Sequence, residues 1–502
     1  MKSYTYILFV LLSLTACSDS FLDKTDPGQI TDDKYWTSEK DVLYATYGIY
    51  DVLQRNAMYG GGPYNPGFRD HDCLSDNSLN FWDWNGLGLL AEGTINKDHW
   101  FLLDYWSDNY AGIARANNVI ENVPAMSVLD EAVKNSYLAE ARFLRALFYF
   151  NLVNTFGDVP LLLEPITVNE SHVPKSSKEE ITHEIIEDLL FAAQNTNVDD
   201  FGRADKGAVL GLLTRVYLYN KQYELAATTA SEVMGMGYDL YPDYPSLFTE
   251  ANEQSNEIVF SVLFQSLSEG EGEKFSGTWA KSPQTHHQPL PNLINDYYCI
   301  DGLPIGQSPL YDASDEIANR DLRLNASILF PGQIWIEGGK PLASNIPKTG
   351  YMMKKYIRNT ILFNTDGPQD FYLIRYADIL LMRAEALIET NNLTQEVYDL
   401  INAVRQRAGM PKIEDVEGSG LSQEALRNIL RHERRVEFAL EGLHYYDLKR
   451  WGTLKEAMER AANDEISVTY KPVFEGEKSY YWPIPQAEVD ANRELDQNPL
   501  WK

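Results

Sequence analysis

The chain has 502 residues, of which 44 % are hydrophobic and 12 % aromatic, so it is long and apolar enough to bury a large core. Its formal net charge of −30 argues against nucleic acid as a partner, because proteins that bind nucleic acid present basic surfaces. The charge argues less firmly against anionic substrates, since a local basic patch could still exist on an acidic protein.

Residues 1–16 predict a secretory signal peptide that ends at a lipidation site. Lys2 precedes an apolar run from Tyr6 to Leu14, which is too short to span a membrane as a mature helix. Leu14-Thr15-Ala16-Cys17 matches a bacterial lipobox, so cleavage would leave Cys17 as a lipidated N-terminus. An ordinary signal peptide cut nearby is the alternative. No other apolar run approaches membrane-spanning length, so we expect attachment through lipid alone.

Residues 17–240 predict a helical framework that one loop-rich segment interrupts. A first helix is expected within 24–57, and the repeated Gly and Pro that follow are typical of a loop over about 58–100. Helical periodicity resumes near Trp100 and predicts further helices over about 131–155, about 178–194 and, as a pair joined at Asn220-Lys221-Gln222, 207–235. Large residues alternate with alanine across this last hairpin, as in tetratricopeptide-like units.

Residues 241–502 predict the same plan with a loop-rich insertion at 265–370. A strand is expected over Glu257–Phe264, ahead of many Gly and Pro residues. From Tyr372 one helix is expected to run to about Leu387, a second to stop at Gly409 and a third to continue through Leu440. The predicted fold is therefore mainly α: a right-handed superhelix of four or so tetratricopeptide-like helical hairpins, with loop-rich insertions and a few short strands.

The third of these helices carries alternating arginine and glutamate residues. We interpret them as ion pairs that bridge packed helices, since such pairs are common on helix faces. His432-Glu433 begins like the zinc-binding pattern H-E-x-x-H, but residue 436 is valine, so the second histidine ligand is missing.

Short motifs in the C-terminal half occur in a specific combination. They are Arg375-Tyr376-Ala377-Asp378 with Ala384-Glu385-Ala386, Ile401-Asn402-Ala403-Val404-Arg405 with Arg407-Ala408-Gly409, Glu433-Arg434-Arg435-Val436-Glu437-Phe438 with Gly442, Asp447-Leu448-Lys449-Arg450-Trp451-Gly452, and Tyr481-Trp482-Pro483-Ile484-Pro485 with Asn498-Pro499. With these motifs the chain resembles the SusD/RagB family of surface-exposed nutrient-binding lipoproteins. The resemblance implies a helical superhelix and, as partner, a SusC-like TonB-dependent β-barrel transporter. The acidic stretch Ser18–Asp23 resembles the family's signal for the outer face of the outer membrane.

The sequence lacks the common catalytic signatures. G-x-S-x-G, the P-loop, G-x-G-x-x-G before a helix and C-x-x-C are all absent from it. Asp70-His71-Asp72 with Asp76 forms an acidic loop that could hold calcium, although its spacing lacks the EF-hand pattern, and no other cofactor is expected. Cys73 and Cys299 could be free or paired. A glycosidase carboxylate pair stays open, because 73 acidic residues offer many combinations.

Tryptophan is the residue type that points to a ligand. Trp82 and Trp84 lie in a Gly-, Asn- and Asp-rich loop, and Trp279 and Trp335 lie in the second loop-rich region. An exposed aromatic face beside amide and carboxylate groups suits a sugar, whose C–H face stacks while its hydroxyls take hydrogen bonds. The alternative is that these rings anchor their loops by packing on the helices.

Glycan-binding members of the family place an aromatic arc with Arg, Asp and Asn partners at such a loop surface. The resemblance maps these partners approximately onto Arg69, Asp76, Trp82, Trp84 and Asn85. The sequence therefore predicts a non-enzymatic, surface-anchored lipoprotein that captures oligosaccharides and delivers them to the transporter. Three alternatives stay open: a RagB-like protein that captures peptides, a lipoprotein glycosidase, and a tetratricopeptide-like adaptor with protein partners only.

Overall fold

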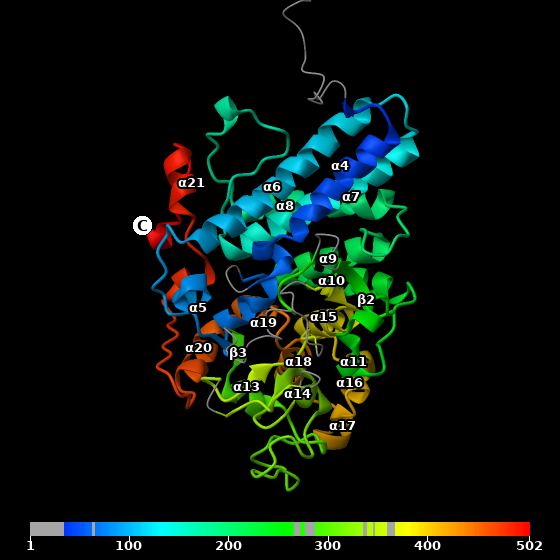
Figure 1. The fold of residues 1–502 in the computed structure, drawn as a ribbon. Helices are drawn as coiled ribbons and strands as arrows, with labels where there is room; N and C mark the ends of the chain where they lie inside the picture. Colours follow the sequence, from blue (N-terminus) through cyan, green and yellow to red (C-terminus); the bar gives the residue numbers. More distant parts are fainter. Residues whose placement is uncertain are drawn as a thin grey trace, which may run out of the picture.

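Helices packed in chain order form the frame of the computed structural model, which describes residues 35–62, 66–265, 272–276, 287–334, 339–344, 347–358 and 367–502. The helices of this part are α4 (Glu39–Leu53), α5 (Leu87–Ala91), α6 (Trp100–Asn122), α7 (Glu131–Thr155), α8 (Lys178–Asn195), α9 (Lys206–Tyr219), α10 (Tyr223–Met234), α11 (Tyr244–Leu247), α13 (Pro291–Asp296), α14 (Leu322–Ser327), α15 (Tyr376–Glu389), α16 (Gln395–Arg407), α17 (Ile413–Val416), α18 (Gln423–Glu437), α19 (His444–Trp451), α20 (Leu454–Ala462) and α21 (Gln486–Ala491). Figure 1 shows α4, α6, α7 and α8 at one end of the molecule and α13, α14 and α17 toward the other.

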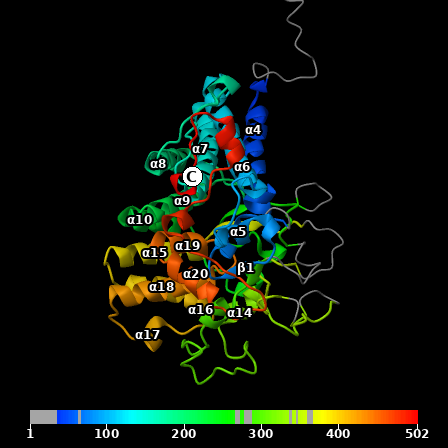
Figure 2. The same cartoon turned by 90° about the vertical axis from the view of Figure 1, so that its left-hand side faces the viewer.

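Each long helix packs on the next one along the chain, from α6 through α10, and α15 then packs on α10. Figure 2 shows α9, α10, α15, α18 and α16 following one another down one side of the molecule. Close approach is possible where residues are small: a Cβ at Gly112 of α6 would lie 2.2 Å from Phe148 of α7. The packing confirms the mainly α fold of helical hairpins.

The described strands are short and form three two-stranded antiparallel sheets. They pair as β1 (Ser78–Asn80) with β3 (His287–Pro289), β2 (Ile258–Val262) with β6 (Phe371–Arg375), and β4 (Ile328–Leu329) with β5 (Met352–Met353). The pair β1–β3 joins the two loop-rich regions to each other, and the pair β4–β5 lies within the second of them. The pair β2–β6 links the residues before and after that second region.

Several predicted boundaries are confirmed, and three are wrong. The long helix occupies 131–155 as expected, and Gly409 follows a helix end with a positive φ of 71°. Residues 372–375 are not helical but lie in β6, because their backbone pairs with β2. The third helix ends at Glu437 rather than Leu440, whose φ is +67° and whose N–H donates to Asp72 Oδ2 at 2.5 Å. The segment 58–100, predicted as loop, contains the short helix α5.

Two carboxylates of the charged run of α18, Glu433 and Glu437, are buried in what we call the core ion network. Its members are the cations Arg323, Lys355, Arg375, Arg405 and Arg407 and the carboxylates Glu257, Asp321, Glu433, Glu437 and Glu441. The two signs are equal in number, so each charge that leaves water has a counter-charge. The network connects β6, α14, α16 and α18, which confirms that the run bridges packed elements.

A second set of buried ion pairs connects α15, α18 and α19. Arg434 of α18 lies 2.8 Å from Asp378 of α15 and 2.9 Å from Asp447 of α19. Arg215 of α9 reaches the other oxygen of Asp378 at 2.8 Å. The short sequence motifs that contain Asp378, Arg434 and Asp447, on which the family resemblance partly rests, therefore hold helices together.

Three carboxyl groups with raised pKa values lie near the start of β6. Burial, and then the charge of Glu253, raise the pKa of Asp370 to about 8. Burial raises the pKa of Glu253 and of Glu273 to about 7. The folded chain keeps these protons at a pH where the unfolded chain has released them. These groups therefore make the protein less stable as the pH rises from about 4 toward 8.

We expect Asp370→Asn to flatten this pH dependence. Asparagine keeps the acceptor for the N–H of Phe264, which lies 2.8 Å from Asp370 Oδ1, and removes the charge that Glu253 repels. The free energy of unfolding in urea, measured at pH 5 and pH 8, should fall less for the variant than for the wild type, by up to about 1.4 kcal/mol per pH unit. Asp490→Asn on α21 is the exposed control. An unchanged slope in Asp370→Asn would contradict the assignment.

Other sequence predictions concern thiols and membrane segments. Cys73 and Cys299 are both buried free thiols, so the open question of pairing is answered. Among the described residues, every helix is too short or too polar to cross a membrane. The predicted signal peptide and Cys17 lie outside the described residues.

Candidate functional site

The loop between β1 and α5 is held in one conformation by local hydrogen bonds. Asn80 Oδ1 accepts from the N–H of Trp82 at 3.1 Å, and Asn85 Oδ1 accepts from the N–H of Leu87 at 3.3 Å. Between them, 83–85 forms a single turn of 3₁₀ helix. Gly86 has a φ of +93° and lies against the ring of His99, so a Cβ there would be both strained and crowded. The loop therefore presents its side chains from a fixed backbone.

Three aromatic rings follow one another along this loop, and we call them the aromatic row. The rings of Phe81 and Trp82 have centroids 4.8 Å apart, and those of Trp82 and Trp84 lie 6.3 Å apart. Trp84 is 40 % exposed, and the other two are partly buried. Lys348 Nζ lies 5.4 Å from the centre of the Phe81 ring. The row offers apolar faces with a cation at one end.

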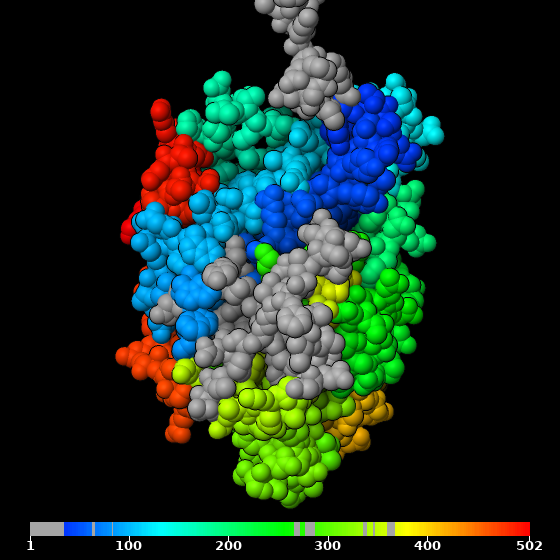
Figure 3. Space-filling model, viewed as in Figure 1, coloured from blue at the N-terminus to red at the C-terminus, as the bar shows by residue number. Residues whose placement is uncertain are grey.

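The aromatic row shares one face of the molecule with the second loop-rich region. Figure 3 shows the segment around residues 80–100 in light blue at one side of this face and the yellow-green segment after residue 300 at its lower end. The pairing of β1 with β3 brings Asn80 opposite His287 and so joins the two regions. A ligand on this face could contact both of them.

The structure does not bring all the predicted site residues to the surface. Asn85 is fully buried, and its Nδ2 has no hydrogen-bond partner in the described part of the chain. Arg69 is 3 % exposed and donates to Asp70 Oδ1 at 3.1 Å and to the carbonyl oxygen of Phe275. Of the mapped residues, only Trp82 and Trp84 lie together with exposed ring surface. Trp279 and Trp335 lie outside the described residues.

Asp76 is buried among basic side chains from the C-terminal helices. It lies 3.0 Å from Arg435, 3.0 Å from His444 and 2.8 Å from Arg460. Burial acts to raise the pKa of Asp76, but Arg435 and the other two partners hold it below its ordinary value. Asp76 therefore fastens the segment before β1 to α18, α19 and α20.

The acidic loop that could hold calcium uses its carboxylates within the protein. Asp70 Oδ1 lies 2.8 Å from His287 Nδ1, and Asp72 accepts from the N–H groups of Leu440 and His444. Within the described ranges, no group of three or more His, Cys, Asp or Glu side chains is placed to hold a metal ion. The arrangement is that of a structural anchor for the loop.

Two residues at the aromatic row, Phe81 and Lys348, were not among the site residues predicted from the sequence. Phe81 could have been found, because it directly precedes Trp82 in the same aromatic run. Lys348 carries no such signal, since it is far away in the sequence and reaches the row only through the fold. It sits there because the N–H of Lys348 donates to Gln288 Oε1 at 2.6 Å, next to β1.

Comparisons with known proteins cover nearly the whole chain. Residues 246–501 match the family model described as the SusD family, and residues 20–218 match one described as "Starch-binding associating with outer membrane". The chain is 28 % identical to the SusD-like protein P2 of Formosa agariphila, over 99 % of both chains.

Two solved structures share the fold along most of the chain. A SusD-like carbohydrate-binding protein from Bacteroides fragilis is 27 % identical with a TM-score of 0.81, covering 92 % of this chain and all of that one. A laminarin-binding SusD-like protein is 27 % identical with a TM-score of 0.73, over 92 % of this chain and 99 % of that one.

Proposed function

This chain belongs to the SusD family, and from that premise we propose that it is a non-enzymatic protein that captures oligosaccharides at the cell surface. The observation that carries the proposal is the aromatic row, which lies on a loop of fixed backbone and includes the 40 % exposed ring of Trp84. Sugar rings have an apolar C–H face that stacks on such rings, and their hydroxyls take hydrogen bonds from neighbouring polar groups. The carbohydrate, starch and laminarin ligands in the descriptions of similar proteins support this ligand class.

In this proposal Trp82 and Trp84 contact the sugar, and Trp279 and Trp335 are further candidate contacts. Arg69, Asp76 and Asn85 are assigned a positioning role, because their side chains are buried. The mechanism is binding alone: the loop is already ordered, so little conformational entropy is lost when a ligand stacks on it.

We further propose that the captured ligand passes to a SusC-like TonB-dependent transporter. Lipid on Cys17 would anchor the protein to the outer membrane, facing the cell exterior. The lipobox at Leu14–Cys17 supports the anchor, and the outer-membrane association in the description matched by residues 20–218 supports the location.

Calorimetric titration of the mature chain without Cys17 tests the ligand class. The ligands are maltohexaose, laminarihexaose, a wider set of neutral oligosaccharides, and a mixed tryptic peptide digest. We expect saturable binding of at least one oligosaccharide, with no new reducing ends after prolonged incubation. Peptide binding without glycan binding would replace the proposal with peptide capture, and release of reducing ends would indicate a glycosidase.

A further inference from the structure

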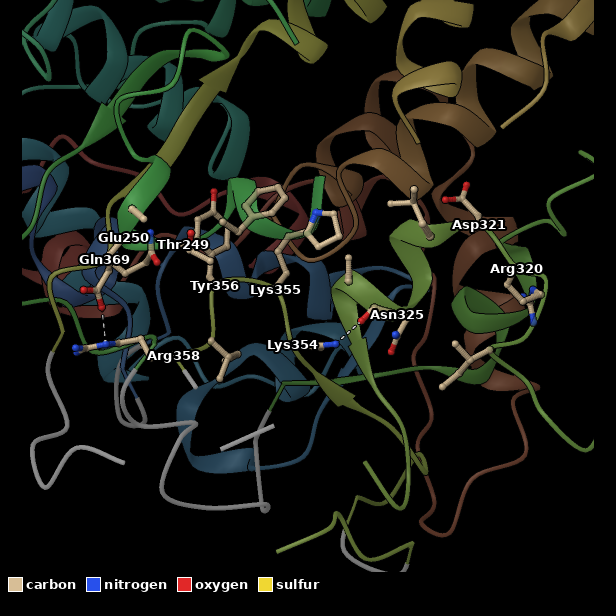
Figure 4. A pocket seen from close by; sticks show the side chains of 17 residues that line it. Thr249, Glu250, Arg320, Asp321, Asn325, Lys354, Lys355, Tyr356, Arg358 and Gln369 are labelled. Atoms are coloured by element: carbon tan, nitrogen blue, oxygen red, sulfur yellow. Dashed lines mark hydrogen bonds and ion pairs between the residues drawn. The ribbon is translucent and has the colours of Figure 1, made fainter. Parts of the chain in front are cut away.

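A cavity of about 680 Å³ lies away from the aromatic row and shares no lining residue with it. Its walls come from the segment after α11, from α14 and from residues 354–358, which follow β5. Figure 4 shows Arg358 and Glu250 at one side of this cavity, Lys354 and Asn325 near its centre, and Arg320 at the other side. Basic side chains therefore surround it, in a chain whose net charge is −30.

Arg320 makes no ion pair with a carboxylate in the described part of the chain, and its contacts are to backbone carbonyl groups. Its guanidinium donates to the carbonyl oxygens of Tyr297 and Ile294, each at 2.6 Å, and of Glu316 at 3.1 Å. Burial lowers the pKa of Arg320 from its ordinary value, although the charges of Glu316 and Asp321 act to raise it. Carbonyl dipoles hold the group in place but leave its charge in the cavity wall.

Lys354 is the second cation of the cavity wall that makes no ion pair with a carboxylate of the described residues. Its Nζ donates to the carbonyl oxygen of Asn325 at 2.7 Å, and an ammonium group has three donors, so further donors are free for a ligand. Burial lowers the pKa of Lys354, and no neighbouring carboxylate raises it. An anion in the cavity would supply the missing counter-charge.

The other charged residues of the cavity wall are already paired. Arg358 Nε lies 2.8 Å from the half-exposed Glu250. Asp321 lies 2.7 Å from Arg323, and Lys355 lies 2.9 Å from Glu441, both within the core ion network. The cavity therefore has a net positive character that comes from Arg320 and Lys354.

Apolar side chains complete the cavity wall. They are Pro245, Phe248, Ile317, Leu322, Ala326 and Ile357. A ligand that fits must combine an apolar face with an anionic group. An acidic sugar has both, because its ring carbons can rest on the apolar wall while a carboxylate or sulfate faces the cations.

We propose that this cavity binds the carboxylate or sulfate group of an acidic oligosaccharide, through Lys354 and Arg320. The inference rests on the proposed function for the sugar part of the ligand and adds a site that selects charge. Neutral sugars would bind through the aromatic row alone. Carboxylate and sulfate sugars both carry an anionic oxygen group on a pyranose ring, and this is the feature that the cavity would recognise.

The test uses pairs of sugars that differ in charge, measured by saturation-transfer NMR titration at constant ionic strength. The probes are glucuronate against glucose and galactose 6-sulfate against galactose. We expect the wild type to bind the acidic member of at least one pair roughly tenfold or more tightly, because a hydrogen bond to a charged group is lost in its neutral partner. Equal affinity within both pairs would overturn the proposal.

Two variants of Lys354 and a control at Lys455 locate the effect. Lys354→Met should remove the preference for the acidic sugar, and Lys354→Gln, which keeps a donor for Asn325, should remove it as well. Lys455→Met, which takes the same charge from an exposed position on α20, should keep it. A preference that survives in both Lys354 variants would overturn the proposal.

Two further arms separate this inference from the proposed function. Trp84→Ala should weaken neutral oligosaccharides while the preference for glucuronate over glucose persists, so each proposal can fail without the other. Gluconate, which carries one carboxylate like glucuronate but has no sugar ring, should bind more weakly than glucuronate. Equal or tighter binding of gluconate would overturn the assignment of the ligand as a sugar.

Discussion

Replacing Arg375 by methionine should destabilise the protein by roughly 3–5 kcal/mol, the effect expected when a buried ion pair loses one partner. Arg375 is 1 % exposed and lies 2.6 Å from Glu257, 2.9 Å from Glu437 and 2.7 Å from Glu441. Methionine fills much of the volume but leaves these carboxylates with one cation fewer. Their mutual repulsion and incomplete solvation would then oppose folding.

Urea denaturation followed by circular dichroism measures this effect. Arg115→Met is the control, because Arg115 pairs with Asp51 at the surface and exposed pairs contribute about 0–1 kcal/mol. Arg375→Lys should lie between the wild type and Arg375→Met, since it keeps the charge but loses the planar fork that reaches several carboxylates at once. A loss below about 1 kcal/mol for Arg375→Met would mean that the other cations of the network suffice.

Adding Glu441→Gln to Arg375→Met separates charge balance from packing. The double variant removes one charge of each sign, so the core ion network is again balanced. If charge imbalance dominates, the double variant should be more stable than Arg375→Met alone. If the lost packing of the Arg375 side chain against Phe248 and Phe438 dominates, the second change should give no recovery.

The regular helices could be predicted from the sequence because their signals are local. Apolar periodicity and a following glycine, Gly157 or Gly409, determine the helix over 131–155 and the stop of α16. The predictions failed where a distant contact decides the backbone. Residues 372–375 are extended because β2 pairs with them, and α18 ends early because Asp72 takes the N–H of Leu440.

The candidate site shows the same division between local and distant information. Trp82 and Trp84 stand out in a polar loop, but the sequence left open whether their rings are exposed. In the structure Trp84 is 40 % exposed and Trp82 is partly buried. Asp76 looked like a ligand contact in the same loop, but Arg435 and Arg460 reach it from more than 350 positions away. The basic cavity has no sequence signal at all, because Arg320 and Lys354 are distant in the sequence, with α14, β4 and β5 between them.

Removing both tryptophan rings of the aromatic row should cost at least about 2 kcal/mol of oligosaccharide affinity, roughly thirtyfold in Kd. The variant is Trp82→Ala with Trp84→Ala, and the measurement is calorimetric titration with the best oligosaccharide found for the wild type. Tryptophan provides a large rigid surface at a small entropic cost, so its loss removes most of the stacking contact.

Tyr44→Ala is the matched control for this change. Tyr44 is an exposed aromatic residue on α4, 54 % accessible, and it takes no part in the row. Its loss should leave the Kd unchanged. Trp84→Phe should retain part of the affinity, because a smaller ring still stacks, whereas a purely structural role for Trp84 would give no such gradation.

Stability measurements determine how the binding result is interpreted. Trp84 is 40 % exposed, and the backbone hydrogen bonds of its loop come from Asn80 and Asn85, so we expect little change in the thermal midpoint of Trp84→Ala. A loss of affinity in a protein of unchanged stability can then be assigned to the ring itself. If affinity persists in the double variant, the aromatic row is not the contact surface, and Trp279 and Trp335 become the residues to change next.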